Sequence, residues 1–174
     1  VPIKNGVITD NFRIIKSVEI VKNILKNSKT VTFTSHMGRP EGKDLNLSLR
    51  PVAKSMEDIL GKKVHFIDEV YGEKVEKQIE KSEFKIFLLE NLRFEKGEIG
   101  NDHNFSKQIT KPFNSYIFDA FGAAHREHAS VVSFGENLDS FQGPLMNKEI
   151  YELDKLLNNS ENGYAVLLGG AKIS

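Results

Sequence analysis

Residues 85–94 read Lys-Ile-Phe-Leu-Leu-Glu-Asn-Leu-Arg-Phe, a nearly apolar run of strand length that ends at polar and charged residues. Short apolar runs of this kind are typical of strands buried on both faces of a parallel sheet. Similar runs predict strands at 30–35, 64–67, 85–89, 115–119 and 164–168. Amphipathic helical patterns lie between them, at 10–26, 48–61, 71–81 and 145–157. The alternation predicts an α/β fold with a parallel sheet flanked by helices.

The composition excludes several classes of protein. The chain has 174 residues, 24 Lys plus Arg against 24 Asp plus Glu, and no Cys or Trp. A balanced charge argues against a protein that binds nucleic acid through its phosphates, and no apolar run is long enough to span a membrane. Without Cys there is no disulfide framework or thiolate metal site. The length fits one domain, or one domain and part of a second.

The arginines carry the most information about function. Only five of the 24 basic residues are Arg, and three of them follow predicted strands: Arg39, Arg93 and Arg126. Arg13 opens the first predicted helix, whereas Arg50 has no such context and is expected at the surface. Because the carboxyl ends of parallel strands share one sheet edge, these Arg are expected to converge there with Arg13. Arg suits planar, bidentate recognition of phosphate or carboxylate, so a small anionic ligand is predicted.

Each of these residues also has a simpler interpretation. Any one Arg could form a local surface ion pair, and the repetition at successive strand ends is what favours a common site. His36 lies beside Arg39 and could donate to the same anion, although a lone His is usually structural. His125 and His128 have a spacing that could suggest zinc, but no third ligand follows at a recognisable spacing, so no metal site is predicted.

Several nucleotide-binding and nucleophile motifs are missing. The sequence contains no Gly-x-Gly dinucleotide fingerprint, P-loop or Gly-x-Ser-x-Gly elbow. Gly169, Gly170, Ala171 and Lys172 follow an apolar strand, where glycine backbone amides could approach a phosphate and the Lys could add a charge. Taken alone, this tetrapeptide also fits a plain tight turn.

Five motifs together resemble the phosphoglycerate kinase family, in order and at suitable spacing. They are Asp-Asn-Phe-Arg-Ile (10–14), Ser-His-Met-Gly-Arg-Pro (35–40), Leu-Glu-Asn-Leu-Arg-Phe (89–94), Asp-Ala-Phe-Gly-Ala-Ala-His-Arg-Glu-His-Ala-Ser (119–130) and Gly-Gly-Ala-Lys (169–172). The resemblance covers essentially the whole chain. It implies a Rossmann-like, three-layer α/β fold truncated at both ends. It also implies an N-terminal phosphoglycerate-binding domain (1–144), an interdomain helix and linker (145–163) and the start of a nucleotide-binding domain (164–174).

The resemblance implies a phosphotransferase of glycolysis that acts on a carboxyl group, converting 1,3-bisphosphoglycerate and ADP reversibly to 3-phosphoglycerate and ATP. It assigns phosphoglycerate binding to Arg13, His36, Met37, Gly38, Arg39, Arg93 and Arg126. It assigns catalysis to Arg13 and Lys172, and nucleotide binding to Gly169, Gly170, Ala171 and Lys172. Mg²⁺ with ADP or ATP is expected mainly on the C-terminal domain. The family further implies a cytoplasmic monomer with small-molecule substrates and no nucleic-acid or membrane partner.

The sequence departs from the family pattern at both ends. An Arg-x-Asp-x-Asn motif, expected just before Val1 on a strand inside the sheet, is absent, and a second Lys is expected beyond Ser174. We therefore expect this chain to be inactive by itself. Two other interpretations stay open: a stand-alone, non-catalytic module that binds phosphate or carboxylate, and an inert fragment whose unpaired sheet edges favour aggregation.

Overall fold

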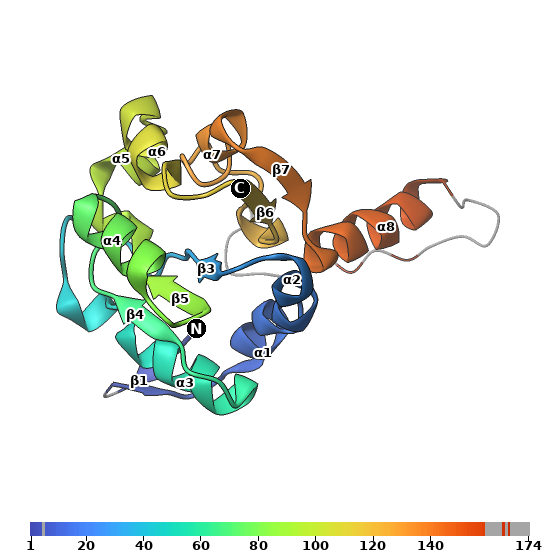
Figure 1. The fold of residues 1–174 in the computed structure, drawn as a ribbon. Coiled ribbons are helices and arrows are strands. Elements are labelled where there is room, and N and C mark those ends of the chain that lie inside the picture. Colours follow the sequence, from blue (N-terminus) through green and yellow to red (C-terminus); the bar gives the residue numbers. More distant parts are fainter. Residues whose placement is uncertain (5, 159–164, 166, 168–174) are drawn as a thin grey trace.

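The computed structural model describes residues 1–4, 6–158, 165 and 167, and these form the α/β fold that the sequence predicts (Figure 1). The described strands are β1 (Ile3–Lys4), β2 (Val7–Ile8), β3 (Val31–Phe33), β4 (His65–Ile67), β5 (Ile86–Leu89), β6 (Ser115–Phe118) and β7 (Asp139–Gln142). The described α-helices are α1 (Phe12–Val18), α2 (Val21–Asn27), α3 (Arg50–Leu60), α4 (Glu73–Lys81), α5 (Lys96–Ile99), α6 (His103–Thr110), α7 (Ser133–Asn137) and α8 (Pro144–Asn158). Short 3-10 turns are η1 (Leu45–Leu47), η2 (Leu92–Phe94) and η3 (Phe121–Ala123).

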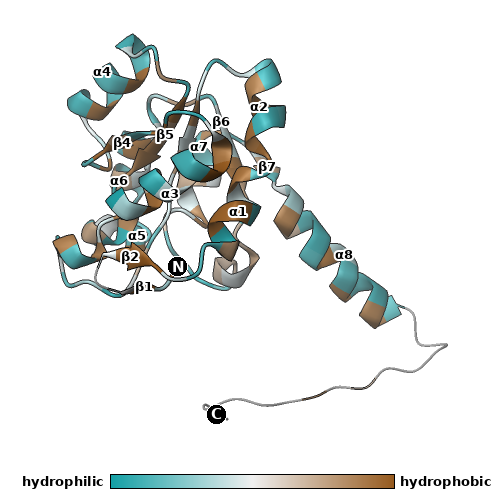
Figure 2. Cartoon of the chain, turned by 90° about the horizontal axis from the view of Figure 1, so that it is seen from below, coloured by the Kyte–Doolittle hydropathy of each residue, from teal (hydrophilic) through white to brown (hydrophobic). Residues whose placement is uncertain are grey.

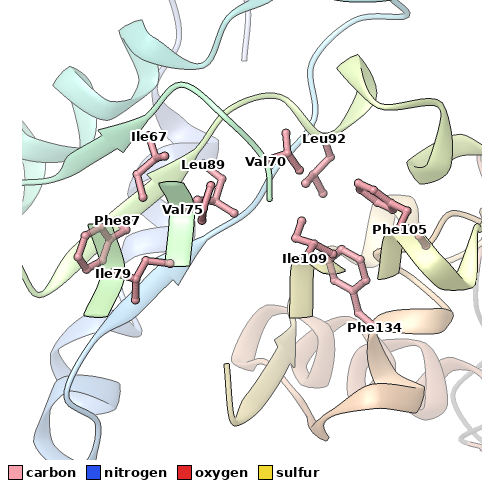
Figure 3. Packing of buried hydrophobic residues seen from close by; sticks show 11 residues of the cluster. Ile67, Val70, Val75, Ile79, Phe87, Leu89, Leu92, Phe105, Ile109 and Phe134 are labelled. Atoms are coloured by element: carbon pink, nitrogen blue, oxygen red, sulfur yellow. The ribbon is translucent and has the colours of Figure 1, made fainter. Parts of the chain in front are cut away.

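Strand β5 is the centre of the molecule. It pairs in parallel with β3 on one side and β4 on the other, and all four of its residues are buried. Ile86 and Leu88 pack into a core with residues of α1, α2 and α3. Phe87 and Leu89 face the opposite core, formed with α4, α6 and α7 (Figure 3). Because successive side chains of a strand point to opposite faces, β5 carries helices on both sides, which confirms the three-layer arrangement.

The last predicted strand of this domain belongs to a second sheet. Strand β6 pairs in parallel with β7, and the described strands contain no pairing between this sheet and the β3-β5-β4 sheet. The predicted strands were expected to share one sheet with their carboxyl ends at one edge, and this is wrong for β6, which belongs to a separate sheet. The sequence analysis also missed β7, whose Asp-Ser-Phe-Gln sequence is exposed throughout and so lacks an apolar run. Strands β1 and β2 form a short antiparallel hairpin.

The helices follow the predicted patterns, except that one predicted helix is divided into two and that α5, α6 and α7 were not predicted. The single helix predicted at 10–26 is interrupted at residues 19–20 and forms α1 and α2. Helix α3 ends at Gly61 as predicted, because this residue adopts a left-handed φ of 61° that glycine tolerates. Helix α8 projects away from the body of the molecule (Figure 2). Strands β4 and β5, within that body, are hydrophobic (Figure 2). The predicted apolar face of α8 stays exposed within the described structure, with Leu157 82% accessible.

Part of the predicted organisation cannot be compared with the structure. Residues 159–163 of the linker, positions 164, 166 and 168 of the strand predicted at 164–168, and the tetrapeptide 169–172 lie outside the described residues. The two boundaries between the three predicted segments therefore stay predictions. Within the described part of the chain, no helix has the length and apolar character needed to cross a membrane.

Candidate anion-binding site

The loop that follows β3 is held in place by a buried amide. Asn91, which is 0% exposed, lies just beyond the end of β5. Its side-chain oxygen accepts a hydrogen bond from the Met37 backbone N–H (3.1 Å), and its side-chain nitrogen donates to the Met37 carbonyl (2.8 Å). The Leu92 N–H also donates to the Ser35 carbonyl (3.0 Å). These contacts tie the loop 36–39 to the segment that carries Arg93.

Arg93 and Gly38 make the next contact between these two segments. Arg93 is only 8% exposed, and its Nη1 donates to the Gly38 carbonyl at 2.6 Å. Gly38 has a φ of 68°, and a Cβ at this position would lie 2.8 Å from the Leu47 side chain. Glycine therefore allows both the turn and the close packing. The Arg93 Nε is buried and has no hydrogen-bond partner within the described structure, so this guanidinium is not fully satisfied by the protein.

Three Arg from three strand ends lie near one another. Arg39 follows β3, Arg93 follows β5 and Arg126 follows β6. Burial lowers the pKa of Arg93, and the charges of Arg126 and Arg39 lower it further, while Glu98 opposes this shift. The structure thus brings together the three strand-end Arg, even though β6 belongs to a separate sheet. An excess of positive charge of this kind attracts a ligand with several negative charges.

Two histidines extend the cluster. The rings of His36 and His128 meet edge to face, with centroids 6.0 Å apart. Burial lowers the pKa of His36 to about 4, with Arg93, His128 and Arg126 as further causes. Burial also lowers the pKa of His128, again with help from Arg93 and Arg126. Both rings are therefore neutral at neutral pH, and each offers one N–H donor and one acceptor nitrogen without adding to the positive charge.

Arg13 lies near the first residue of the chain. Burial lowers the pKa of the Val1 amino group, and Arg13 lowers it further. That amino group in turn contributes to the lowered pKa of His36, so Val1 lies near both Arg13 and His36. Arg13 itself is exposed near the start of α1. Arg50 is exposed as predicted, and its guanidinium lies 4.6 Å from the centre of the Phe66 ring.

One member of the cluster, Glu98, was not predicted from the sequence. Glu98, which is 0% exposed on α5, has its carboxylate 3.5 Å from Nδ1 of His128. Burial raises the pKa of Glu98, while hydrogen bonds from Ser130 and the charge of Arg93 act in the opposite direction. Glu98 and His128 are 30 positions apart, so no local spacing in the sequence predicts their contact. The sequence feature closest to this contact was the spacing of His125 and His128. In the structure His125 is exposed and His128 is buried.

The same residues include potential metal ligands. One donor atom from each of His36, Glu98 and His128 lies within 4.8 Å of the others. Two neutral imidazoles and a carboxylate can bind Zn²⁺, and the sequence did not predict that His36 and Glu98 lie beside His128. The guanidinium groups of Arg93 and Arg126 surround the cluster and oppose a divalent cation electrostatically. The arrangement suits an anion better, and the absence of a metal site stays a prediction.

Comparison with known proteins agrees with the resemblance of the motifs. The family model described as phosphoglycerate kinase matches residues 1–174. The chain belongs to the phosphoglycerate kinase family. The phosphoglycerate kinase of Thermosipho africanus is 44% identical over 176 residues, and that of Fervidobacterium nodosum is 41% identical over 176 residues. In both comparisons all of this chain matches 44% of the relative, so the chain spans less than half of their length.

Solved structures of phosphoglycerate kinases share the fold. The structure from Coxiella burnetii is similar with a TM-score of 0.79 and 30% identity, over 92% of this chain and 41% of that one. The crystal structure from Pyrococcus horikoshii is similar with a TM-score of 0.80 and 27% identity, with the same coverage. These phosphoglycerate kinases confirm the predicted α/β class. The role of each site residue stays a prediction.

The lowered pKa of His36 predicts that this phosphoglycerate kinase chain loses stability in acid. An unfolded His titrates near 6.5, whereas His36 in the fold titrates near 4, so only the unfolded state takes up this proton between those values. The contribution of neutral His36 to the stability of the fold is present above pH 6.5 and is lost as the pH falls toward 4. Urea unfolding from pH 7 to pH 4.5 should show a steeper loss for the wild type than for His36→Gln.

Glu98 acts in the opposite direction, because a raised carboxyl pKa favours the fold most at low pH. Glu98 is present in both the wild type and His36→Gln, so the difference between the pH profiles of their stability reports on His36 alone. Parallel profiles for the wild type and His36→Gln would contradict the prediction.

Proposed function

We propose that this chain is the phosphoglycerate-binding part of a phosphoglycerate kinase. The observation that carries the proposal is the convergence of Arg39, Arg93 and Arg126 beside two neutral histidines, His36 and His128. The phosphate and carboxylate of 3-phosphoglycerate would bind there through charge-assisted hydrogen bonds. Family membership over the whole chain supports the assignment.

The proposed reaction explains why the cluster contains no activated nucleophile. In the direction that consumes ATP, the attacking group is the substrate's own carboxylate, which is ionised at neutral pH with a pKa of about 4. No general base is needed, and the protein has to align the two substrates and neutralise charge. An Arg-rich site meets those requirements. Exclusion of water is also needed, since an acyl phosphate hydrolyses readily, and closure of two domains would provide it.

We assign the individual roles as follows. Arg13 stabilises the transferring phosphoryl group, and Lys172 approaches the same group from the nucleotide side. The loop 36–39, Arg93 and Arg126 hold the phosphoglycerate. The segment 169–172 contributes to nucleotide binding, and its geometry lies outside the described residues.

Magnesium enters this proposal as part of the nucleotide substrate. Mg²⁺ prefers carboxylate, phosphate and water oxygens, whereas the described cluster offers Glu98 as its buried carboxylate among several Arg. We therefore assign the metal to the nucleotide-binding domain. The partners we propose are the two small-molecule substrates, with the full-length kinase acting as a cytoplasmic monomer in glycolysis.

Replacing Arg126 with alanine should weaken 3-phosphoglycerate binding by about 10- to 100-fold, since charge-assisted hydrogen bonds are each worth about 1.5–3 kcal/mol. Isothermal titration calorimetry of the full-length protein measures this change. Arg50→Ala is the matched control, because Arg50 is exposed on α3 and packs against Phe66. Equal affinities for the two variants would remove Arg126 from the site.

A coupled assay separates the kinase from a non-catalytic anion-binding module, because both bind 3-phosphoglycerate. The full-length protein should form ADP from ATP and 3-phosphoglycerate. Adding the complementary C-terminal half to this chain should restore part of that activity. Binding without turnover in the full-length protein would favour the module instead.

A further inference from the structure

A buried carboxylate anchors the turn that carries Arg126 and His128. The Ser130 backbone N–H donates to one oxygen of Glu98 (3.0 Å), and the Ser130 hydroxyl donates to the other (2.6 Å). The backbone carbonyl of Glu98 accepts a further bond from the Ala129 N–H (2.8 Å). Glu98 therefore holds the end of this turn through both its side chain and its main chain.

The same carboxylate faces the His128 ring. Oε1 of Glu98 lies 3.5 Å from Nδ1 of His128, and this nitrogen is buried with no hydrogen-bond partner among the described residues. A carboxylate beside one ring nitrogen favours the proton on that nitrogen and fixes the tautomer. The other nitrogen, Nε2, then carries the lone pair of the neutral ring, so it can accept a hydrogen bond from a hydroxyl group of a ligand.

Anchoring alone does not require a charge at this position. Burying a carboxylate costs several kcal/mol unless it is compensated, and a neutral Gln could also bond to the Ser130 N–H and hydroxyl. A carboxylate, unlike Gln, also interacts electrostatically with the neighbouring charged residues. Arg126 and Arg39 lower the pKa of Arg93 and Glu98 opposes this shift, so the carboxylate lies within electrostatic reach of the Arg cluster.

We propose that Glu98 is a positioning residue. Through Ser130 it holds the turn that carries Arg126, and through its charge it orients the ring of His128 in the anion site. This inference rests on the proposed function, since the anion is taken to be 3-phosphoglycerate. The bonds to Ser130 fix the turn, and the charge facing Nδ1 fixes the His128 ring. Loss of the charge alone should therefore weaken substrate binding even where the turn stays anchored.

The test is a double-mutant cycle in the full-length protein. Glu98→Gln keeps the shape of the side chain and a bond to Ser130 but removes the charge that faces His128. It should raise the dissociation constant of 3-phosphoglycerate by about 10-fold in the wild-type background, and by much less in a His128→Gln background. The KM for ATP should not change, because nucleotide binding does not depend on this turn.

Glu57→Gln is the matched control. Glu57 also uses its carboxylate to accept a backbone N–H, that of Val64 at 3.1 Å, but it is on α3 and outside the cluster. It should leave the affinity for 3-phosphoglycerate unchanged. An unchanged affinity in Glu98→Gln, an equal loss in both backgrounds or a parallel rise in the KM for ATP would overturn the positioning role. Failure of the wild-type protein to bind 3-phosphoglycerate would overturn the proposed function itself, and the role of Glu98 with it.

Discussion

Replacing Arg13 with alanine should lower the turnover of the full-length protein by a factor on the order of 10³ while its fold survives. The expected loss is large because a guanidinium that contacts a transferring phosphoryl group acts mainly in the transition state. The expected stability is close to that of the wild type because Arg13 is exposed, and its side chain makes no hydrogen bond or ion pair with other described residues. The coupled assay measures turnover, and thermal unfolding measures stability.

Two further variants make this prediction specific. Arg13→Lys keeps the charge but loses the planar fork, so it should recover only part of the lost turnover. Lys22→Ala removes an exposed positive charge from the neighbouring helix α2 and should leave turnover unchanged. Wild-type turnover in Arg13→Ala would exclude Arg13 from the chemistry. An equal loss in Lys22→Ala would instead indicate a general effect of surface charge.

The sequence predicted the parts of the fold whose burial is uniform or periodic. Strand β5 is apolar at every position because both of its faces are covered, and α3 shows a clear amphipathic stripe that ends at Gly61. Shorter or more polar elements gave no comparable signal. Helix α6 has eight residues, and its start depends on Asp102, whose side chain accepts from the Phe105 N–H. Strand β7 is exposed, so its pairing with β6 could not be read from an apolar pattern.

The site was predicted where it depends on position along strands and missed where it depends on contacts between distant segments. Arg39, Arg93 and Arg126 could be grouped because each follows a strand, and the charges that lower the pKa of Arg93 place them together. Glu98 could not be found in this way. It lies on the four-residue helix α5, and its partners Ser130 and His128 are about 30 positions further along the chain.

Replacing Asn91 with alanine should lower the free energy of unfolding by about 3–5 kcal/mol. The Asn91 side chain makes four hydrogen bonds: it accepts from the N–H groups of Met37 and Arg93, both at 3.1 Å, and donates to the carbonyls of Met37 (2.8 Å) and Leu47 (2.9 Å). Alanine would leave these backbone groups without their partner in a region where Asn91 itself is fully buried. Urea unfolding of the wild type and the variant measures the difference.

The same substitution should also weaken the anion site, because Asn91 joins the loop 36–39 to the turn of Arg93. Asn23→Ala is the control: Asn23 is exposed on α2, and its side chain bonds only to Lys26 among the described residues, so the expected loss is below about 0.5 kcal/mol. A loss below about 1 kcal/mol in Asn91→Ala would mean that water replaces the missing amide and that the loop does not depend on it. A large loss of stability with unchanged affinity for 3-phosphoglycerate would contradict the predicted effect on binding. It would show that Asn91 stabilises the fold but that the loop 36–39 reaches its binding geometry without it.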